Sequence, residues 1–179
     1  MRGIYLLDSD LRFRGVIPPE DQSFVDLAGR FDGTPIGEAW RPFDLEYDPD
    51  SMHLPLGDFP SIFLSRIPVF SVRAAEALEP VLRTNGEMFR LRCDNDEYVA
   101  FNVTSVVGAL SNTADIHYFP SGRIMAVTRY VLERKRLTSK GIFKLLEVPL
   151  LDVFVDDQFL EIVKRSQLRG FSFKPIDVN

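Results

Sequence analysis

The sequence is poor in the side chains that most often carry redox and metal chemistry. Among its 179 residues there is one cysteine, Cys93, and there are two histidines, His53 and His117. A single cysteine excludes an intrachain disulfide. Neither histidine has a second histidine or a cysteine at the spacing of a metal-binding motif, so we expect no metal and no cofactor. We expect Cys93 to be a small buried residue and both histidines to have surface or packing roles.

Long apolar runs are also missing. No stretch approaches the roughly 18 apolar residues of a membrane-spanning helix. The apolar run near the N-terminus is too short for a secretion signal, and Asp8 and Asp10 interrupt it. We therefore expect a cytoplasmic protein with no membrane partner. The net charge of −5 disfavours general binding to nucleic acid.

The sequence lacks the short motifs that identify common enzyme classes. It has no glycine-rich phosphate-binding loop and no G-x-S-x-G nucleophile elbow. Ser71 precedes a stretch of good helix formers, so we interpret it as a helix N-cap rather than a nucleophile. These observations predict a protein that is not an enzyme.

The composition is typical of one globular domain. Hydrophobic residues make up 45% of the chain and charged residues 26%, which argues against disorder. A chain of this length can bury a full core without disulfides. The 15 phenylalanines predict a core rich in aromatic contacts. We expect residues 1–179 to form a single domain.

The spacing of apolar and turn residues predicts an α+β fold with mainly antiparallel strands and two or more helices. Short strands are expected at residues 3–7, 11–17, 88–93, 98–103, 123–127, 130–133, 142–146, 153–155 and 171–173. Residues 88–93 and 98–103 should form a hairpin, and residues 123–127 should pair with residues 130–133. Repeated strand-then-long-helix units, which would indicate a doubly wound parallel sheet, are missing.

Two helices are predicted from their capping residues. Ser71 should cap the first helix, and Asn85 with Gly86 should end it. Pro80 lies inside this stretch and should kink, tighten or shorten the helix. Asp156 should cap a second helix. Its buried face is expected to contain Phe159, Ile162 and Val163.

Acidic residues cluster in the middle of the chain. Residues 31–60 are rich in Gly, Pro and Asp, which predicts a long irregular surface excursion anchored by Trp40. No Lys or Arg lies between positions 44 and 58, where the five acids are Asp44, Glu46, Asp48, Asp50 and Asp58. Three more acids, Asp94, Asp96 and Glu97, lie at the expected hairpin tip. The set is either ordinary solvated surface or a partner-binding face.

Positive charge gathers further along the chain. The basic residues of this segment are Arg129, Arg134, Lys135, Arg136 and Lys140. Such a cluster can contact phosphate groups. A basic edge strand that discourages pairing with other chains explains it equally well.

An ordered series of turn, cap and strand motifs runs through the chain. Its central part comprises Gly57-Asp58-Phe59-Pro60, Ile67-Pro68-Val69-Phe70-Ser71, Ala74-Ala75-Glu76-Ala77-Leu78-Glu79-Pro80, Asn85-Gly86-Glu87, Leu91-Arg92-Cys93-Asp94 and Asn102-Val103-Thr104. Before it come Gly33, Pro35-Ile36-Gly37 and Trp40. After it come Phe119-Pro120, Gly122-Arg123-Ile124-Met125, Ile142-Phe143, Pro149, Phe154-Val155, Phe159, Gly170-Phe171 and Phe173. In this order the motifs resemble the immunity-protein domain family of bacterial polymorphic toxin systems, formerly a domain of unknown function.

The resemblance covers roughly four-fifths of the chain. It implies an antidote that protects its producer by binding a cognate protein toxin. Such a protein needs a rigid scaffold, an exposed complementary patch and charge that steers the encounter, but no catalytic groups. The family shares its motifs mostly at structural positions, so the resemblance does not locate the binding face. We expect that face on the acidic excursion, joined by the acids of the hairpin tip.

Two other functions fit the sequence. One is an enzyme or a small-ligand-binding protein whose site assembles from distant residues such as Tyr98, His117 and a carboxylate; a deep pocket with perturbed titratable groups would support it. The other is a nucleic-acid-binding module that uses residues 129–140.

Overall fold

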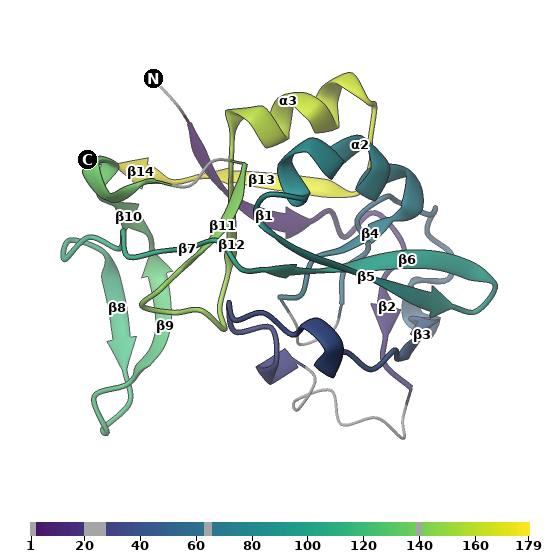
Figure 1. The fold of residues 1–179 in the computed structure, drawn as a ribbon, viewed down its shortest axis with the longest axis horizontal. Coiled ribbons are helices and arrows are strands. Elements are labelled where there is room, and N and C mark those ends of the chain that lie inside the picture. The colour runs from purple at the N-terminus through teal and green to yellow at the C-terminus, as the bar shows by residue number, and fades with distance from the viewer. Residues whose placement is uncertain (1–2, 20–27, 63–65, 139–140) are drawn as a thin grey trace.

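Two five-stranded sheets and two neighbouring helices enclose the main core (Figure 1). The computed structural model describes residues 3–19, 28–62, 66–138 and 141–179. In this part of the chain, strands outnumber helices and most strand pairs are antiparallel. The predicted α+β class is therefore confirmed. No helix in the described part is both long and apolar enough to cross a membrane.

The first sheet joins the two ends of the sequence. Its strands, in spatial order, are β13 (Phe171–Pro175), β1 (Ile4–Ser9), β12 (Val153–Asp156), β11 (Ile142–Leu145) and β7 (Val106–Val107). All neighbours are antiparallel except β7 and β11. β11 and β12 are buried along their whole length, which fits their central position in the sheet.

The second sheet contains the predicted hairpin. Its strands, in spatial order, are β2 (Val16–Ile17), β3 (Asp44–Tyr47), β5 (Gly86–Cys93), β6 (Asp96–Val103) and β4 (Val69–Ser71). β5 and β6 form the hairpin, and β3 lies parallel to β5 on its outer side. Glycine is required at the start of β5, because a Cβ atom at Gly86 would lie 2.0 Å from the carbonyl oxygen of Asn102.

Both helices begin where their caps predict. α2 (Val72–Leu82) is capped by Ser71, whose Oγ accepts a hydrogen bond from the amide of Ala74 at 3.1 Å. α3 (Asp157–Arg165) is capped by Asp156, whose carboxylate accepts from the amides of Gln158 and Phe159. α2 continues past Pro80 for two residues. The helices pack side by side, and their apolar faces close the core (Figure 1).

Aromatic side chains fill the main core, as the phenylalanine content predicts. Phe70 lies near the rings of Phe59, Phe101 and Phe159, with centroids 5.3–6.5 Å apart. A second apolar cluster lies under the excursion. There Trp40 stacks on Phe89 with centroids 4.2 Å apart, so the predicted anchoring role of Trp40 is confirmed.

The excursion is irregular apart from β3 and two 3-10 turns, η1 (Gly37–Ala39) and η2 (Pro49–Ser51). Two sets of hydrogen bonds fasten it to the sheets. The Glu87 carboxylate accepts hydrogen bonds from the amides of Ile36 and Gly37 at 2.7 and 2.9 Å. The buried Lys144 ammonium on β11 donates to the carbonyl oxygens of Phe31 and Pro149.

Two strand predictions need correction. The strand expected at residues 11–17 is limited to β2, because residues 11–13 form a turn. Residues 123–127 and 130–133 do not pair with each other. β9 (Ile124–Arg129) pairs with β8 (Asp115–Tyr118), and β10 (Val131–Leu132) pairs in parallel with β14 (Asp177–Val178).

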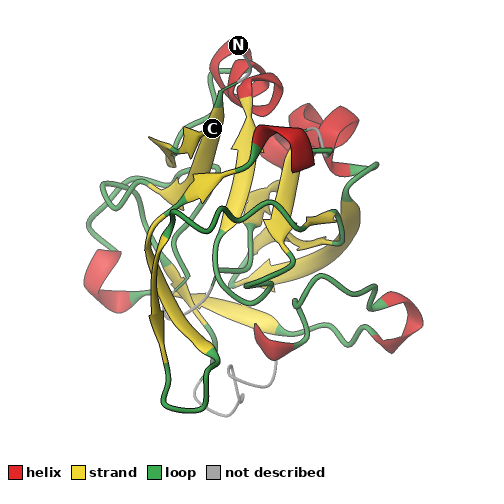
Figure 2. Cartoon of the chain, turned by 90° about the vertical axis from the view of Figure 1, so that its left-hand side faces the viewer, coloured by secondary structure: helices red, strands yellow, loops and turns green. Residues whose placement is uncertain are grey.

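The second error has a simple physical cause. Only Tyr130 separates β9 from β10, and its side chain is buried in the core. A hairpin needs at least two turn residues between its strands, and a single buried residue cannot reverse the chain. β9 therefore pairs with β8 instead of β10. The resulting β8–β9 hairpin projects from the body of the molecule (Figures 1 and 2). The last short element is a 3-10 turn, η3 (Arg134–Arg136).

Candidate functional site

Acids from two distant segments meet at the end of the second sheet. In the parallel pairing of β3 with β5, Asp44 lies opposite Arg92 and Leu45 lies opposite Cys93. β5 ends at Cys93, and Asp94 with Asn95 forms the tight turn into β6. The strand carrying Asp44 and Glu46 therefore adjoins the hairpin tip. We call Asp44, Glu46, Asp94, Asp96 and Glu97 the acidic corner.

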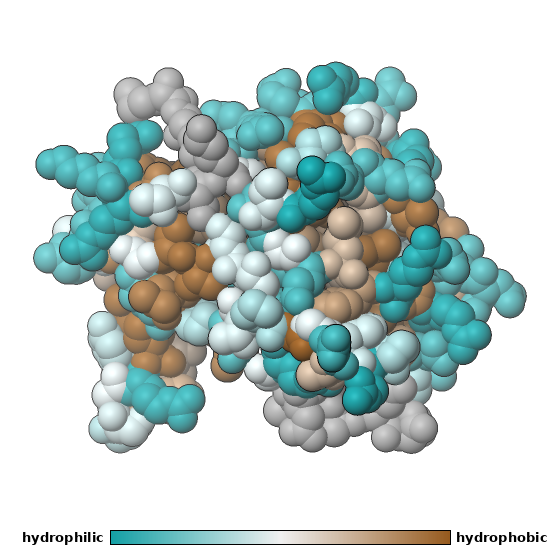
Figure 3. Space-filling view, in the orientation of Figure 1, coloured by the Kyte–Doolittle hydropathy of each residue, from teal (hydrophilic) through white to brown (hydrophobic). Residues whose placement is uncertain are grey.

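All five side chains of the acidic corner are exposed. Alternation along β3 places Asp44 and Glu46 outward and Leu45 inward, as expected for a half-buried strand. Asp94 has a φ of 52°, a left-handed conformation that Asp and Asn tolerate better than most residues. Hydrophilic residues cover this end of the hairpin in Figure 3. The local backbone thus explains why these carboxylates face solvent.

Tyr47 ties the two segments of the acidic corner together. Its hydroxyl donates to Oδ2 of Asp96 at 2.6 Å and lies 3.2 Å from the hydroxyl of Tyr98. Burial raises the pKa of Tyr47, and its hydrogen bonds to Asp96 and Tyr98 raise it further. The guanidinium of Arg14 lies over the Tyr47 ring, 5.1 Å from its centroid. This contact network holds β3 against the hairpin tip.

The acidic corner keeps an excess of negative charge. Arg92 forms an ion pair with Asp44 at 3.3 Å, and Arg90 forms one with Glu97 at 3.4 Å. Both pairs are largely exposed, so each contributes little to stability. Among the described residues, Glu46 and Asp94 have no hydrogen-bond or ion-pair partner at their carboxylates. Five carboxylates therefore lie near three guanidinium groups, those of Arg14, Arg90 and Arg92.

Asp48 and Asp50 follow β3 directly, at the 3-10 turn η2. The Asp48 carboxylate accepts a hydrogen bond from the amide of Asp50 at 3.1 Å and caps η2. Asp48 is half-buried, whereas Asp50 is exposed. Asp50 is thus available to a partner, and Asp48 has a structural task as well.

Asp58 does not belong to an exposed acidic face, contrary to the sequence-based expectation. It is buried and accepts hydrogen bonds from Ser71 Oγ at 2.8 Å, from Arg73 Nη2 at 2.9 Å and from the amide of Arg169 at 2.8 Å. Burial opposes ionisation of Asp58, but these hydrogen bonds outweigh it and lower its pKa. Asp58 therefore joins the start of α2 to the loop after α3.

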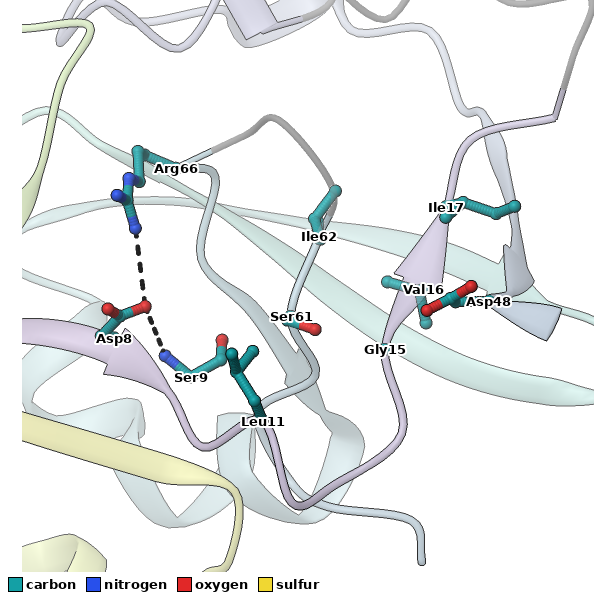
Figure 4. Close-up of a pocket in the computed structure, with 10 residues that line it drawn as sticks. All are labelled: Asp8, Ser9, Leu11, Gly15, Val16, Ile17, Asp48, Ser61, Ile62 and Arg66. Carbon is teal, nitrogen blue, oxygen red and sulfur yellow. Dashed lines mark hydrogen bonds and ion pairs between the residues drawn. The ribbon is translucent and has the colours of Figure 1, made fainter. Parts of the chain in front are cut away.

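Two polar hollows flank the excursion. One has a volume of about 600 Å³ and lies beside the acidic corner; its lining includes Leu56, Arg73, Asp96, Glu97, Tyr98 and Arg169. The other has a volume of about 440 Å³ (Figure 4). In it, the Asp8 carboxylate accepts from the Ser9 amide at 2.8 Å and forms an ion pair with Arg66 at 3.5 Å. Leu11 and Asp48 line the same hollow.

The potentially reactive residues have separate structural surroundings. Cys93 is fully buried, and burial raises the pKa of its thiol to about 12, with the nearby carboxylates Asp94, Asp96 and Glu46 adding to the shift. The thiolate is therefore disfavoured at neutral pH. Ser71 caps α2 and donates to Asp58.

The residues of the alternative enzyme site do not come together. Tyr98 lies on β6 and His117 on β8, and these strands are at opposite ends of the longest axis of the molecule (Figure 1). His117 is exposed on its strand, and His53 is exposed on a loop of the excursion. The expected surface role of both histidines agrees with this placement.

The basic segment is partly neutralised. Arg129 forms ion pairs with Asp115 at 2.8 Å and with Asp177 at 3.4 Å, and Arg136 forms one with Glu133 at 3.0 Å. Arg134 and Lys135 are exposed. Lys140 lies outside the described residues.

Sequence reasoning missed Tyr47 and Lys144. Tyr47 could have been found, because exposed acids alternate with Leu45 and Tyr47 in a strand pattern. Lys144 gave no such signal: a lysine between apolar strand residues usually points to solvent. Its burial depends on two carbonyl oxygens from distant loops.

Comparison with known proteins adds no relative: no family model matches this chain. No curated protein matches it either.

Proposed function

We propose that this protein is a cytoplasmic antidote that neutralises a cognate bacterial toxin by forming a stoichiometric complex. The order of its sequence motifs, which resembles that of toxin-immunity proteins, suggests the role. The observation that carries the proposal is the acidic corner. It joins two acidic segments that are distant in sequence, one on β3 and one at the β5–β6 turn. The parallel pairing of β3 with β5, in which Asp44 lies opposite Arg92, holds them side by side.

The acidic corner has the properties of a binding surface for a basic partner. Its carboxylates are exposed, and their backbone is fixed by β3, β5 and β6 rather than by a loose loop. A rigid surface loses little conformational entropy on binding. Toxins that act on nucleic acid carry basic clefts, and an excess of carboxylates complements such a cleft and accelerates the encounter.

Stoichiometric binding requires no chemistry from the antidote. Cys93 and Ser71 have structural tasks, and the exposed His117 is far from the acidic corner. The proposal therefore rests on surface charge and rigidity, and the residues of the acidic corner contact the toxin directly. The nucleic-acid alternative has less support, because Arg129 and Arg136 are already ion-paired.

The proposal is tested with the product of the gene adjacent to that of this protein. We expect co-expression to rescue cells that express the adjacent gene product as an active toxin. The two purified proteins should form a complex of fixed composition in size-exclusion chromatography. Toxin activity should fall linearly with added antidote and reach its minimum at the ratio found in the complex.

Two results would contradict this mechanism. Rescue without any detectable complex would exclude stoichiometric binding. Full inhibition at an antidote-to-toxin ratio of about one to ten would indicate catalytic turnover instead, since one bound antidote can block only one toxin.

A further inference from the structure

We infer that the toxin-contacting surface continues from the acidic corner onto an apolar ridge, which binds an apolar patch bordered by Lys and Arg on the toxin. The ridge consists of two adjacent loops, residues 10–14 and residues 51–57. This inference rests on the proposed function and adds the apolar centre of the same interface.

Direct contacts hold the two loops of the apolar ridge together. The amide of Arg14 donates to the carbonyl oxygen of Pro55 at 2.9 Å, and its Nη2 donates to the carbonyl oxygen of Met52 at 2.9 Å. Phe13 packs so closely on Gly57 that a Cβ atom there would lie 3.1 Å from the Phe13 side chain. The loops therefore form one surface.

This surface exposes three large apolar side chains. Leu11 is 74% exposed, Met52 49% and Leu56 45%. A single exposed leucine is ordinary. Three such residues on two hydrogen-bonded loops are less common, and exposed apolar groups that cluster in this way mark interaction sites. Methionine in particular is enriched at protein interfaces.

The apolar ridge is continuous with the acidic corner. The Arg14 guanidinium, which donates a hydrogen bond to the Met52 carbonyl oxygen, also lies over the ring of Tyr47. The Tyr47 hydroxyl in turn donates a hydrogen bond to the Asp96 carboxylate. Leu56 lines the 600 Å³ hollow together with Asp96 and Glu97.

The 440 Å³ hollow, which borders the ridge at Leu11, also contains carboxylates. Leu11 lines the 440 Å³ hollow together with Asp48 (Figure 4). Both hollows also hold guanidinium groups, Arg66 in the smaller one and Arg73 and Arg169 in the larger one. Arg66 is paired with Asp8 and Asp152, and Arg73 with Asp58, so charged groups of both signs flank the apolar side chains on two sides. This is the arrangement of a protein interface, with an apolar centre and a polar rim.

The charge of the rim selects the partner. Three of the arginines in and beside the ridge, Arg12, Arg66 and Arg73, are paired with carboxylates. Together with the acidic corner, the rim therefore keeps an excess of negative charge, which disfavours nucleic acid and anionic lipid. A second copy of the chain would bring like charges together. A protein with basic side chains around an apolar patch complements both the centre and the rim.

The test replaces apolar side chains of the ridge by neutral polar ones of similar size, so that charge is unchanged. The probe is the adjacent gene product, inactivated by mutation, and its binding is measured by surface plasmon resonance. We expect Met52→Gln with Leu56→Gln to weaken binding by about tenfold, mainly through faster dissociation, because the lost apolar contact forms only in the complex.

The chain supplies a matched control pair. Met125 is 48% exposed and Leu150 is 53% exposed, close to the values for Met52 and Leu56. Met125 lies on β9, whose hairpin with β8 projects from the end of the molecule opposite to the acidic corner and has apolar surface of its own (Figures 1 and 3). We expect Met125→Gln with Leu150→Gln to change the dissociation constant by less than about twofold.

The outcomes separate this inference from the proposed function. If the wild-type protein binds and the ridge variant binds equally well, the apolar ridge is not part of the interface, although the antidote function stands. A larger loss in the control pair would move the apolar contact to the surface around Met125 or Leu150 and overturn the inference. If the wild-type protein forms no complex, the proposed function fails first.

Discussion

At the scale of single residues, the most unusual group is the ammonium of Lys144. It is buried, and its hydrogen-bond acceptors are the carbonyl oxygens of Phe31 and Pro149 rather than a carboxylate at bonding distance. Burial lowers the pKa of Lys144 to about 8, although Asp32 acts in the opposite direction. In the unfolded chain its pKa should return to about 10.4. The folded state therefore releases this proton at lower pH than the unfolded state does.

This difference predicts how Lys144 affects stability at alkaline pH. At pH 7 both states hold the proton, and the folded protein carries the full cost of burying the charge. Between about pH 8 and pH 10 the unfolded state binds more protons, so stability due to Lys144 rises with pH. We expect the unfolding free energy of wild type, minus that of Lys144→Met, to increase over this interval in urea titrations. Parallel pH profiles for the two proteins would show that folding does not lower the pKa of Lys144.

Asp58 should stabilise the folded state at neutral pH and lose this effect in acid. Replacing it by alanine leaves Ser71, Arg73 and an amide without their acceptor, which should cost about 2 kcal/mol of unfolding free energy at pH 7. Its pKa is lowered on folding, so this contribution is present above about pH 4 and fades as pH falls further. Asp115→Ala, which removes an exposed ion pair, is the control and should cost less than about 1 kcal/mol. Equal losses for both variants would contradict the structural role of Asp58.

At the scale of secondary-structure elements, local signals were the most reliable. Ser71 and Asp156 marked the helix starts because a side-chain cap acts within three residues. The β5–β6 hairpin was also predicted, because its strands are neighbours in the sequence. The failures concern distant partners: β10 pairs with β14, almost 50 residues away. The short strands β2 and β10 have too few residues to show a period at all.

Pro80 lies inside α2, and its effect on the unfolding free energy can be measured. A proline near the end of α2 lacks the amide hydrogen that would bond to the carbonyl of Glu76, and its ring crowds that carbonyl. Pro80 is exposed, so alanine there loses no core contact. We expect Pro80→Ala to raise the unfolding free energy by about 1 kcal/mol or more, measured by thermal and urea unfolding. Glu76→Ala, in the same helix, should change it by less than about 0.5 kcal/mol. A destabilised Pro80→Ala protein would mean that the turn after α2 depends on the proline.

At the scale of the whole molecule, the acidic corner and the exposed Asp50 of the excursion should govern the rate of toxin association. Glu46→Lys with Asp50→Lys reverses one acid of the acidic corner and Asp50, both exposed and without an ion pair among the described residues. Glu76→Lys with Glu161→Lys produces the same change in net charge on the helices, where both acids are also exposed. We expect only the first variant to associate more slowly at low salt and to lose most of its salt dependence.

The measurement is the association rate at several ionic strengths, because the screening length falls from about 30 Å at 0.01 M to about 8 Å at 0.15 M. Slowing by the same factor in both variants would show that net charge, and not the acidic corner, steers the toxin. Unchanged rates in the Glu46→Lys and Asp50→Lys variant would place the interface elsewhere.

The sequence predicted the acids of the site but not their arrangement. Asp44 and Asp94 are far apart in the chain, and their proximity depends on the parallel pairing of β3 with β5, which no local motif encodes. Sequence composition places Asp58 among the exposed acids because it does not distinguish a solvated carboxylate from one that accepts four hydrogen bonds. Burial and long-range pairing are the two properties that a single sequence does not contain.

The position of β1 has a consequence for how the protein is made. β1 lies between β12 and β13, so it is hydrogen-bonded on both sides by strands synthesised about 150 residues after it. At about 5–20 residues per second, the N-terminal strand waits roughly 10–30 s for its neighbours. Until then β1 has neither of its partner strands, and its apolar side chains have no sheet to pack in. A chain that ends before Val153 lacks both neighbours of β1, so the first sheet can form only in a late step of translation.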